Sequence, residues 1–431
     1  MSTTSLLSEL AWRELLFQHT DGVEAHLAAG PVAGYCGFDP TAPSLHVGNL
    51  VPVMGLVHLQ RAGHRPVALV GGCTGLIGDP SGRSSERQLN TPDVVEHNVR
   101  GIRAQLERFL DFSGSSAARM VNNADWLVEI RAVDFLRDVG RHFTVNYMMA
   151  KESVKARVES ESGISFTEFS YMLLQAYDFL ELHRRFGVTL QVGGSDQWGN
   201  MTAGTSLVRK VLGREAHVLT FPLVTTASGE KFGKSAGNAI WLDPERTSPY
   251  QFFQYWVNAD DRDVPRFLRF FTLHDRARIE ALEREWAEHP ERRLAQRELA
   301  REVTTRVHGA DAARVAEEVS ALLFGGGDAG SLSPAALDAL RREIPFIEFT
   351  PKPPDHDPSA PAVLDAFEMA VLAGLVKSKG EARRLAQQGG LYVNGEKQDA
   401  AAVDPGRLLN GGHLLLRKGA RAYALVRVGR A

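Results

Sequence analysis

One segment of the chain combines polar donors with a glycine where a helix is expected to begin. It reads DPTAPSLHVGN over residues 39–49, and its Thr41, His46 and Asn49 could supply donors to phosphate oxygens. Gly48 lets a flat or anionic ligand approach the backbone, where the N–H groups and dipole of a helix N-terminus favour negative charge. Taken alone, the segment is equally consistent with a polar turn that caps a helix.

A second segment, KFGKS over residues 231–235, lies in a Gly/Ser-rich stretch. Lys231 and Lys234 could neutralise the charge that builds on a departing pyrophosphate. Its Gly-Lys-Ser end is similar to that of a P-loop, but that motif needs a glycine five positions before Gly233, where the chain has Ser228. A solvated basic loop would explain these residues alone, whereas the two segments together favour a polyphosphate site.

A third group of polar residues lies within an expected helix. The stretch SFTE at residues 165–168 supplies cap-type residues for a helix running to about Arg185. At about 100° per residue, Tyr171, Gln175 and Asp178 fall within a stripe of roughly 60° on one face. The stripe is either a solvated face or a pocket wall, and a Tyr, a Gln and an Asp suit a small zwitterion. Asp178 could accept a hydrogen bond from a substrate hydroxyl or pair with an amine, and Tyr35 could hold the same group.

A fourth group, LQVGGSDQW over residues 190–198, predicts a strand, a glycine turn and a capped helix. Ligands of open α/β sheets bind beyond the carboxyl ends of the strands, where Asp196 would suit a ribose diol. A Gly-Gly turn of this kind is also common without any ligand.

These segments belong to a stretch, residues 33–243, in which short apolar runs alternate with helical stretches, the pattern of a Rossmann-like α/β domain with a parallel sheet. The expected strands are Gly34–Phe38, Val67–Val70 and Val188–Val192, with a helix at Leu50–Leu59. After Thr247 the strand signals stop. The expected domains are a catalytic domain at 1–244, an α-helical domain at 245–344, a proline-rich linker at 345–361 and a small α+β domain at 362–431.

Composition narrows the class of protein. The 431 residues are 44% hydrophobic and 23% charged, with two cysteines, and no apolar run approaches the roughly 20 residues needed to cross a bilayer. Two cysteines cannot build a disulfide framework, and no signal or transit peptide is evident, so we expect a cytoplasmic protein without a membrane partner.

Charge is distributed unevenly along the chain. The net charge is −3, but residues 362–431 hold eleven Lys/Arg and six Asp/Glu, a net of +5, which leaves −8 for the rest. A basic terminal domain on an otherwise acidic protein predicts a polyanionic partner for that domain. Its expected basic helix, residues 375–388, carries Lys377, Lys379, Arg383 and Arg384.

Several longer motifs resemble those of the bacterial tyrosyl-tRNA synthetases, a family of class I aminoacyl-tRNA synthetases with a C-terminal S4-type RNA-binding domain. They are YCGFDPT (35–41), GLIGDPSG (75–82), NYMMAK (146–151), the run from Phe169 to Phe179, and GGSDQWGN (193–200). The resemblance covers essentially the whole chain. The two class I signatures, usually His-Ile-Gly-His and Lys-Met-Ser-Lys-Ser, are altered here at Asn49 and at Phe232-Gly233.

The resemblance implies a role for each matching residue. Residues implied to act in catalysis at the phosphates are Thr41, His46, Asn49, Arg83, Arg87, Lys231 and Lys234. Residues implied to bind tyrosine are Tyr35 and Asp178 at the phenol, Asp79, Tyr171 and Gln175 at the ammonium group, and Gln197 near the carboxylate. Residues implied to bind ATP are Cys36, Gly37, Asp39, Gly48, Gly193, Asp196, Leu223, Val224 and Lys234.

The implied activity is tyrosine–tRNA ligation. L-Tyrosine reacts with ATP and Mg²⁺ to give tyrosyl-adenylate and pyrophosphate, and the tyrosyl group then passes to the 3′ end of tRNA(Tyr). The tyrosine carboxylate is itself the nucleophile, so alignment and positive charge suffice without a catalytic triad or a protein metal cage. The resemblance also implies a homodimer formed through residues 121–148. Two alternatives stay open: a tryptophanyl-tRNA synthetase, since Asp178 could accept an indole N–H, and a non-catalytic RNA-binding protein.

Overall fold

The computed structural model describes residues 5–81, 89–159, 163–227, 229, 232–235, 238–324, 327–353 and 362–429. The chain divides into two compact units, Met1–Thr247 with Tyr255–Val307 and Ser248–Gln254 with His308–Ala431. No helix within the described ranges combines the length and the apolar character needed to span a membrane.

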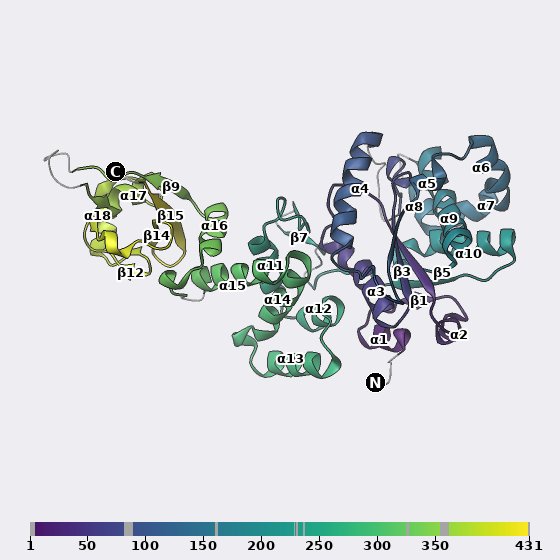
Figure 1. Ribbon diagram of the computed structural model, residues 1–431, viewed down its shortest axis with the longest axis horizontal. Helices are drawn as coiled ribbons and strands as arrows, with labels where there is room; N and C mark the ends of the chain where they lie inside the picture. The colour runs from purple at the N-terminus through teal and green to yellow at the C-terminus, as the bar shows by residue number, and fades with distance from the viewer. Residues whose placement is uncertain are drawn as a thin grey trace. The chain divides into compact units, whose positions relative to one another are not determined.

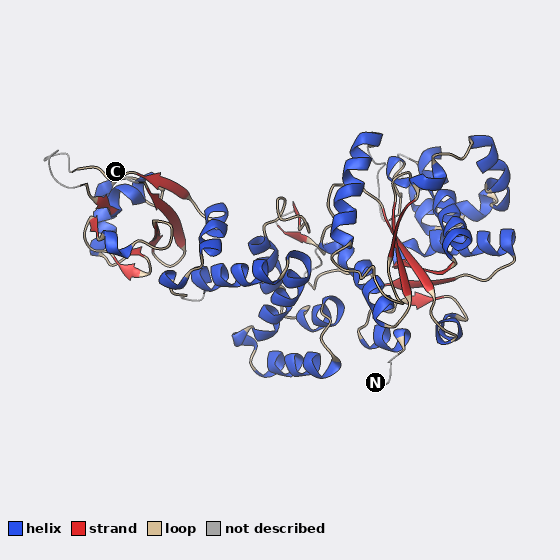
Figure 2. Ribbon diagram, in the orientation of Figure 1, coloured by secondary structure: helices blue, strands red, loops and turns tan. Residues whose placement is uncertain are grey.

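A six-stranded sheet forms the centre of the first unit, in the order β1-β6-β5-β2-β3-β4 (Figures 1 and 2). Its strands are β1 (Gln18–His19), β2 (Ala33–Phe38), β3 (Arg65–Val70), β4 (Arg119–Asn122), β5 (Val188–Gly194) and β6 (His217–Phe221). Strands β2 to β6 run parallel, and β1 pairs antiparallel with β6 at one edge. The expected parallel α/β sheet is confirmed, and β1, β4 and β6 are additional strands.

Helices cover both faces of this sheet, α3 and α4 on one side and α9 and α10 on the other (Figure 1). The helices of this part of the chain are α1 (Leu6–Trp12), α2 (Val23–Ala28), α3 (Leu50–Arg61), α4 (Pro92–Leu106), α5 (Ala124–Leu127), α6 (Ala132–Asp138), α7 (Val145–Met149), α8 (Glu152–Val158), α9 (Phe166–Phe186) and α10 (Trp198–Leu212). Helix α9 begins where expected, because the Ser165 side chain accepts the Glu168 N–H, and it ends at Gly187 with φ +64°. Its apolar residues join the core beneath β2 and β3.

Helices follow Thr247, as expected from the loss of strand signals. They are α11 (Pro249–Val257), α12 (Val264–Phe271), α13 (Arg276–Glu288), α14 (Leu294–His308), α15 (Ala310–Phe324) and α16 (Pro334–Glu343). The two compact units share this helical segment: α12 and α13 belong to the first, whereas α15 and α16 belong to the second.

The second unit has a five-stranded sheet in the order β12-β11-β14-β15-β9. Its elements are β9 (Phe346–Phe349), β10 (Leu364–Asp365), α17 (Ala366–Leu372), α18 (Lys379–Gln387), β11 (Leu391–Val393), β12 (Glu396–Lys397), β13 (Ala402–Val403), β14 (His413–Lys418) and β15 (Ala422–Val428). One face of the sheet packs on α17 and α18, and the other packs on α15 and α16. The expected linker differs from the structure over residues 346–349: the apolar sequence FIEF forms β9, which pairs parallel with β15. Residues 354–361 of that linker lie outside the described part.

Candidate active site

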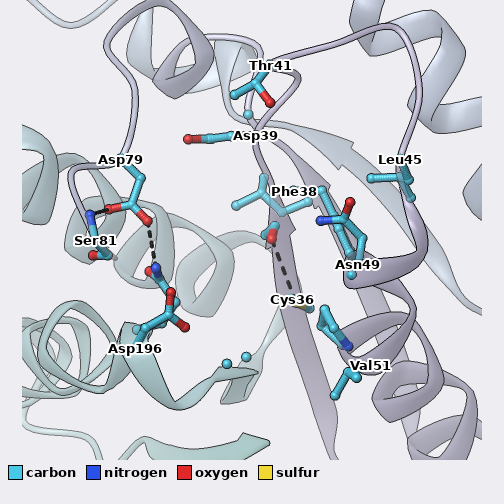
Figure 3. A pocket seen from close by; sticks show the side chains of 18 of the residues that line it. Cys36, Phe38, Asp39, Thr41, Leu45, Asn49, Val51, Asp79, Ser81 and Asp196 are labelled. Carbon is cyan, nitrogen blue, oxygen red and sulfur yellow. Dashed lines mark hydrogen bonds between the residues drawn. The ribbon is translucent and has the colours of Figure 1, made fainter. Parts of the chain in front are cut away.

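A cavity of about 580 Å³ lies at the carboxyl ends of β2 and β5, the edge at which parallel sheets bind ligands. Figure 3 shows Asp79 and Asp196 on one side of it and Asn49 on the other, with Asp39 and Thr41 between them. The expected site residues that line it are Tyr35, Cys36, Gly37, Asp39, Thr41, His46, Gly48, Asn49, Asp79, Tyr171, Gln175, Asp178, Gly193, Asp196, Gln197, Leu223 and Val224. Arg83, Arg87 and Lys231 lie outside the described residues, and Lys234 begins the short strand β7 (Lys234–Ser235), which pairs with β8 (Asn238–Ala239).

One wall of the cavity holds a buried carboxylate beside a buried phenol. Asp178 is 2% exposed and Tyr35 is 1% exposed. The Asp178 Oδ1 atom accepts the Trp126 indole N–H at 2.7 Å, and Oδ2 accepts the Asn123 amide at 3.0 Å. The Tyr35 hydroxyl has no hydrogen-bond partner among the described residues. A buried hydroxyl without a partner is costly, so this atom is suited to a ligand that supplies one.

Burial governs the protonation of both groups. It raises the pKa of Asp178 to about 7, although the hydrogen bonds from Asn123 and Trp126 act in the opposite direction. Burial also raises the pKa of Tyr35 well above its usual value, and the nearby Asp178 charge adds to that rise. Tyr35 is therefore a neutral hydroxyl at physiological pH. Sequence reasoning missed Asn123 and Trp126, which no motif marks.

A hydrogen-bond network around Asp79 and Gln175 lines another part of the cavity. The Gln197 amide donates to Asp79 Oδ2 at 2.6 Å, and the Ser81 backbone N–H donates to Asp79 Oδ1 at 3.0 Å. Asn200 donates to Gln175 Oε1 at 3.0 Å and thereby fixes that amide with its oxygen acceptor engaged. Asn200 is another residue that sequence reasoning did not single out.

Tyr171 is tied to the end of β2. Its hydroxyl donates to Asp39 Oδ2 at 2.7 Å, and the Thr74 hydroxyl donates to Asp39 Oδ1 at 2.8 Å. Burial raises the pKa of Tyr171 well above its usual value, and the charges of Asp39 and Asp79 raise it further. The neutral Tyr171 therefore retains its proton, with carboxylates on two sides that suit a cationic group.

The His46 segment shapes the other end of the cavity. His46 is the N-cap of a short 3₁₀ helix (Val47–Asn49), and its Nδ1 accepts the Gly48 N–H at 3.0 Å. This hydrogen bond assigns the neutral ring proton to Nε2, which is then a donor. Asn49 Oδ1 accepts the His46 backbone N–H at 3.0 Å. The asparagine in the altered signature thus closes a capping box on this short 3₁₀ helix, directly before α3.

The His46 and lysine segments meet at two glycines. Gly233 has φ +82°, and a Cβ there would lie 2.9 Å from the Gly48 backbone nitrogen. A side chain at 233 would therefore force the two segments apart. This contact accounts for the glycine at position 233 of the altered lysine signature, because a residue with a side chain would not fit there.

Asp196 follows β5, Gln191 lies within β5 and Cys36 lies within β2, and all three line the cavity. Burial raises the pKa of Asp196, and the Asp79 carboxylate adds to that rise. Burial raises the pKa of the Cys36 thiol to about 12, so the thiol stays protonated. Gln191, which lies opposite Tyr35 in the β2–β5 register, is buried and has an Oε1 atom without a partner among the described residues. Its position in the interior of an expected strand gave no signal of a site.

The expected RNA-binding residues lie on or next to α18 in the second unit, outside this cavity. Lys379 Nζ bonds the carboxylates of Asp365 at 3.0 Å and Glu368 at 2.7 Å. Lys377, Arg383 and Arg384 are exposed. The Lys377 backbone N–H donates to Glu381 Oε2 at 2.9 Å.

Comparisons with known proteins agree with this geometry. Residues 27–325 match the family model "tRNA synthetases class I (W and Y)", and residues 359–426 match "Tyrosine--tRNA ligase SYY-like C-terminal domain". Tyrosine–tRNA ligase of Anaeromyxobacter dehalogenans is 54% identical over 426 residues, covering 98% of this chain and 99% of the relative. Tyrosine–tRNA ligase of Acidothermus cellulolyticus is 52% identical over 428 residues, covering 98% of each chain.

Among solved structures, a C-terminally truncated mitochondrial tyrosyl-tRNA synthetase of Aspergillus nidulans matches with a TM-score of 0.68 at 31% identity, covering 74% of this chain and 94% of that one. A tryptophanyl-tRNA synthetase of Plasmodium falciparum matches with a TM-score of 0.51 at 15% identity, covering 71% of this chain and 84% of that one, and shares the fold. The match of the family model over most of the chain, together with relatives of more than 50% identity, shows that the chain belongs to the class I tRNA synthetases of the W and Y family.

Proposed function

We propose that the protein is a tyrosine–tRNA ligase, which activates L-tyrosine with ATP and transfers the tyrosyl group to tRNA(Tyr). The unpartnered Tyr35 hydroxyl beside the Asp178 carboxylate carries this proposal. A phenolic hydroxyl can donate to Asp178 and pair with Tyr35, whereas the phenyl ring of phenylalanine leaves the Tyr35 hydroxyl without a partner. Discrimination by buried polar groups of this kind is strong, and tyrosine against phenylalanine in this enzyme class is the standard illustration of it.

The remaining polar residues suit the rest of the substrate. Asp79, Tyr171 and Gln175 would bind the ammonium group, and Gln197 would lie near the carboxylate. With the amino acid held in this way, its carboxylate attacks the α-phosphorus of ATP and pyrophosphate leaves. The chain contributes alignment and donors, so no general base is required.

The donors near the phosphates come from the two meeting segments. His46 Nε2–H and Thr41 would bind phosphate oxygens, together with Arg83, Arg87, Lys231 and Lys234. Asp196 would accept from the ribose hydroxyls, while Cys36, Gly48 and Leu223-Val224 would border the nucleoside. Described residues of the chain include no group of three His, Cys, Asp or Glu side chains placed to hold a metal ion. Mg²⁺ would therefore enter on the phosphates of ATP and supply charge neutralisation there.

We further propose a division of labour along the chain. Residues 1–244 would perform activation, the helical segment 245–344 would contact the anticodon part of tRNA(Tyr), and residues 362–431 would bind RNA through exposed cations such as Lys377, Arg383 and Arg384. A cytoplasmic location follows from the proposed role in protein synthesis.

A homodimer is supported by exposed apolar side chains in the expected interface region. Val133 is 68% exposed, Leu136 58% and Val145 63%. Val133 and Leu136 are three residues apart on α6 and so share one face of that helix. Exposed apolar residues on one helix face favour a protein interface. Replacing Val133 and Leu136 by lysine should yield a monomer in sedimentation equilibrium, and an unchanged mass would reject this interface.

Tyrosine-dependent exchange of labelled pyrophosphate into ATP, measured with each of the twenty amino acids, tests the main proposal. We expect exchange with tyrosine and at most weak exchange with phenylalanine or tryptophan. A preference for tryptophan would make the protein a tryptophan enzyme, and the absence of exchange with every amino acid would reject activation altogether.

A further inference from the structure

We propose that Tyr255 is a positioning residue that fixes the backbone between Lys231 and Lys234 against the His46 segment. The inference rests on the proposed tyrosine activation, because it assigns Tyr255 to the ATP half of that reaction. Tyr255 lies on α11 and does not line the cavity, whereas Phe232 and His46 do. It would act through the loop that it holds.

The main chain at Gly233 is held on two sides. Its N–H donates to the Tyr255 hydroxyl oxygen at 3.1 Å, and its C=O accepts the Ile240 N–H at 2.9 Å. The Ile240 C=O in turn accepts the Val47 N–H at 2.9 Å. Backbone hydrogen bonds thus connect the lysine segment with the His46 segment, and the close approach of Gly233 to Gly48 leaves no room for slippage.

The side chain at Phe232 is held separately by an aromatic cluster. Phe232 is 5% exposed, and its ring stacks on Phe271 with centroids 5.3 Å apart and an interplanar angle of 7°. Phe267 lies 5.1 Å away and Trp256 6.1 Å away, centroid to centroid. These separations fall within the range of roughly 4.5–7 Å for favourable aromatic pairs. The ring anchors the side chain, and the Tyr255 hydroxyl anchors the adjacent amide.

This double anchor matters for catalysis because the two lysines flank Phe232 and Gly233 in the sequence. Cationic donors stabilise a leaving pyrophosphate effectively only when they are held in place before the reaction begins. Tyr35 and Asp178 line the wall proposed for the phenol, whereas Tyr255 lies on α11 and does not line the cavity. Loosening Gly233 should therefore reduce the rate of adenylate formation and leave tyrosine binding unchanged.

The variant Tyr255→Phe tests the inference, since it removes the hydroxyl and keeps the ring. In the pyrophosphate-exchange assay, kcat should fall by about three- to tenfold, the cost of one hydrogen bond, with KM for tyrosine unchanged. Hydrogen–deuterium exchange of the Gly233 amide in the full-length protein should be faster in the variant. Phe232→Ala should lower kcat as well. In Phe232→Met the methionine side chain again fills the space among the aromatic rings, so this variant should retain most of the wild-type kcat.

The matched control is Tyr423→Phe. Its hydroxyl donates to the Leu322 carbonyl at 3.3 Å in the second unit, so this variant also removes one tyrosine-to-backbone hydrogen bond. We expect wild-type exchange kinetics from it. The positioning role is overturned if Tyr255→Phe has the same kcat as the wild type. It is also overturned if KM for tyrosine rises by as large a factor as kcat falls. If the wild type shows no exchange at all, the proposed function fails, and an unchanged Gly233 amide rate then rejects the anchor independently.

Discussion

Replacing Tyr35 by phenylalanine should change substrate selectivity and protein stability in opposite directions. Bound tyrosine would lose one hydrogen bond to a neutral hydroxyl, worth about 0.5–1.5 kcal/mol, so kcat/KM for tyrosine should fall roughly two- to tenfold. Phenylalanine should gain, because it would no longer leave the Tyr35 hydroxyl unpaired. The ratio of the two specificity constants should therefore fall by about tenfold or more.

The free protein should become more stable through the same change. The Tyr35 hydroxyl is buried without a partner in the described structure, and such a group costs about 1–3 kcal/mol. The phenylalanine ring would keep the edge contact with Phe179, whose centroid lies 5.2 Å from that of Tyr35. We therefore expect the free energy of unfolding in urea to rise by about 1 kcal/mol. Tyr423→Phe is the control, because its hydroxyl is paired and its loss should destabilise the protein.

Pyrophosphate exchange with tyrosine and phenylalanine, and urea unfolding without substrate, measure the two effects. Unchanged selectivity would remove Tyr35 from the pocket. A loss of stability would mean that the hydroxyl has a partner in the free protein, and the reasoning from an unpaired group would then be wrong.

Three further predictions concern Asp178, the C-terminal residues and the basic helix. Because burial raises the pKa of Asp178 to about 7, the folded state holds a proton between about pH 4 and 7 that the unfolded state has released. The free energy of unfolding should fall by up to about 4 kcal/mol as pH rises through that window, and a parallel pH profile for Asp178→Asn would contradict this assignment. Deleting residues 362–431 should leave pyrophosphate exchange largely intact and impair tRNA charging. The deletion should also lower solubility, because it uncovers β9, α15 and α16. Equal loss of both activities would mean that the tail supports the catalytic fold. In filter-binding assays, replacing Arg383 and Arg384 by glutamine should reduce the slope of log Kd for tRNA against log salt concentration by about one to two. Lys379→Gln is the control. Because Lys379 already bonds Asp365 and Glu368, its replacement should leave the slope unchanged.

Much of the fold was predictable because its signals are local. The apolar runs of β2, β3 and β5 and the cap at Ser165 each specify an element within a few residues. Strand β9 was not predictable in the same way. Its four residues precede a proline-rich stretch, and they become a strand because β15, some eighty residues later in the sequence, supplies the hydrogen bonds.

The site shows the same division. Tyr171, Gln175 and Asp178 were expected on one helix face, since their spacing follows the helical repeat, and the structure places all three along the cavity. Asn123, Trp126 and Asn200 were missed, because each acts by holding another side chain. Asn123 and Trp126 lie in no motif, and Asn200 ends the GGSDQWGN motif without a role of its own being expected. Gln191 was missed because an interior strand position normally indicates core packing.

The sequence by itself determined the chemistry: cations and glycines for a polyphosphate, a polar helix face for a small zwitterion, and a basic terminal region for a polyanion. Residue type and short-range spacing carry that information. Tertiary structure alone decided which groups are paired and which are left open. It gave Asp178 two donors and the Tyr35 hydroxyl none, bound Lys379 to two carboxylates, and brought Gly233 against Gly48. Pairing and desolvation depend on segments that meet only when the chain folds, and they determine the strength of each interaction.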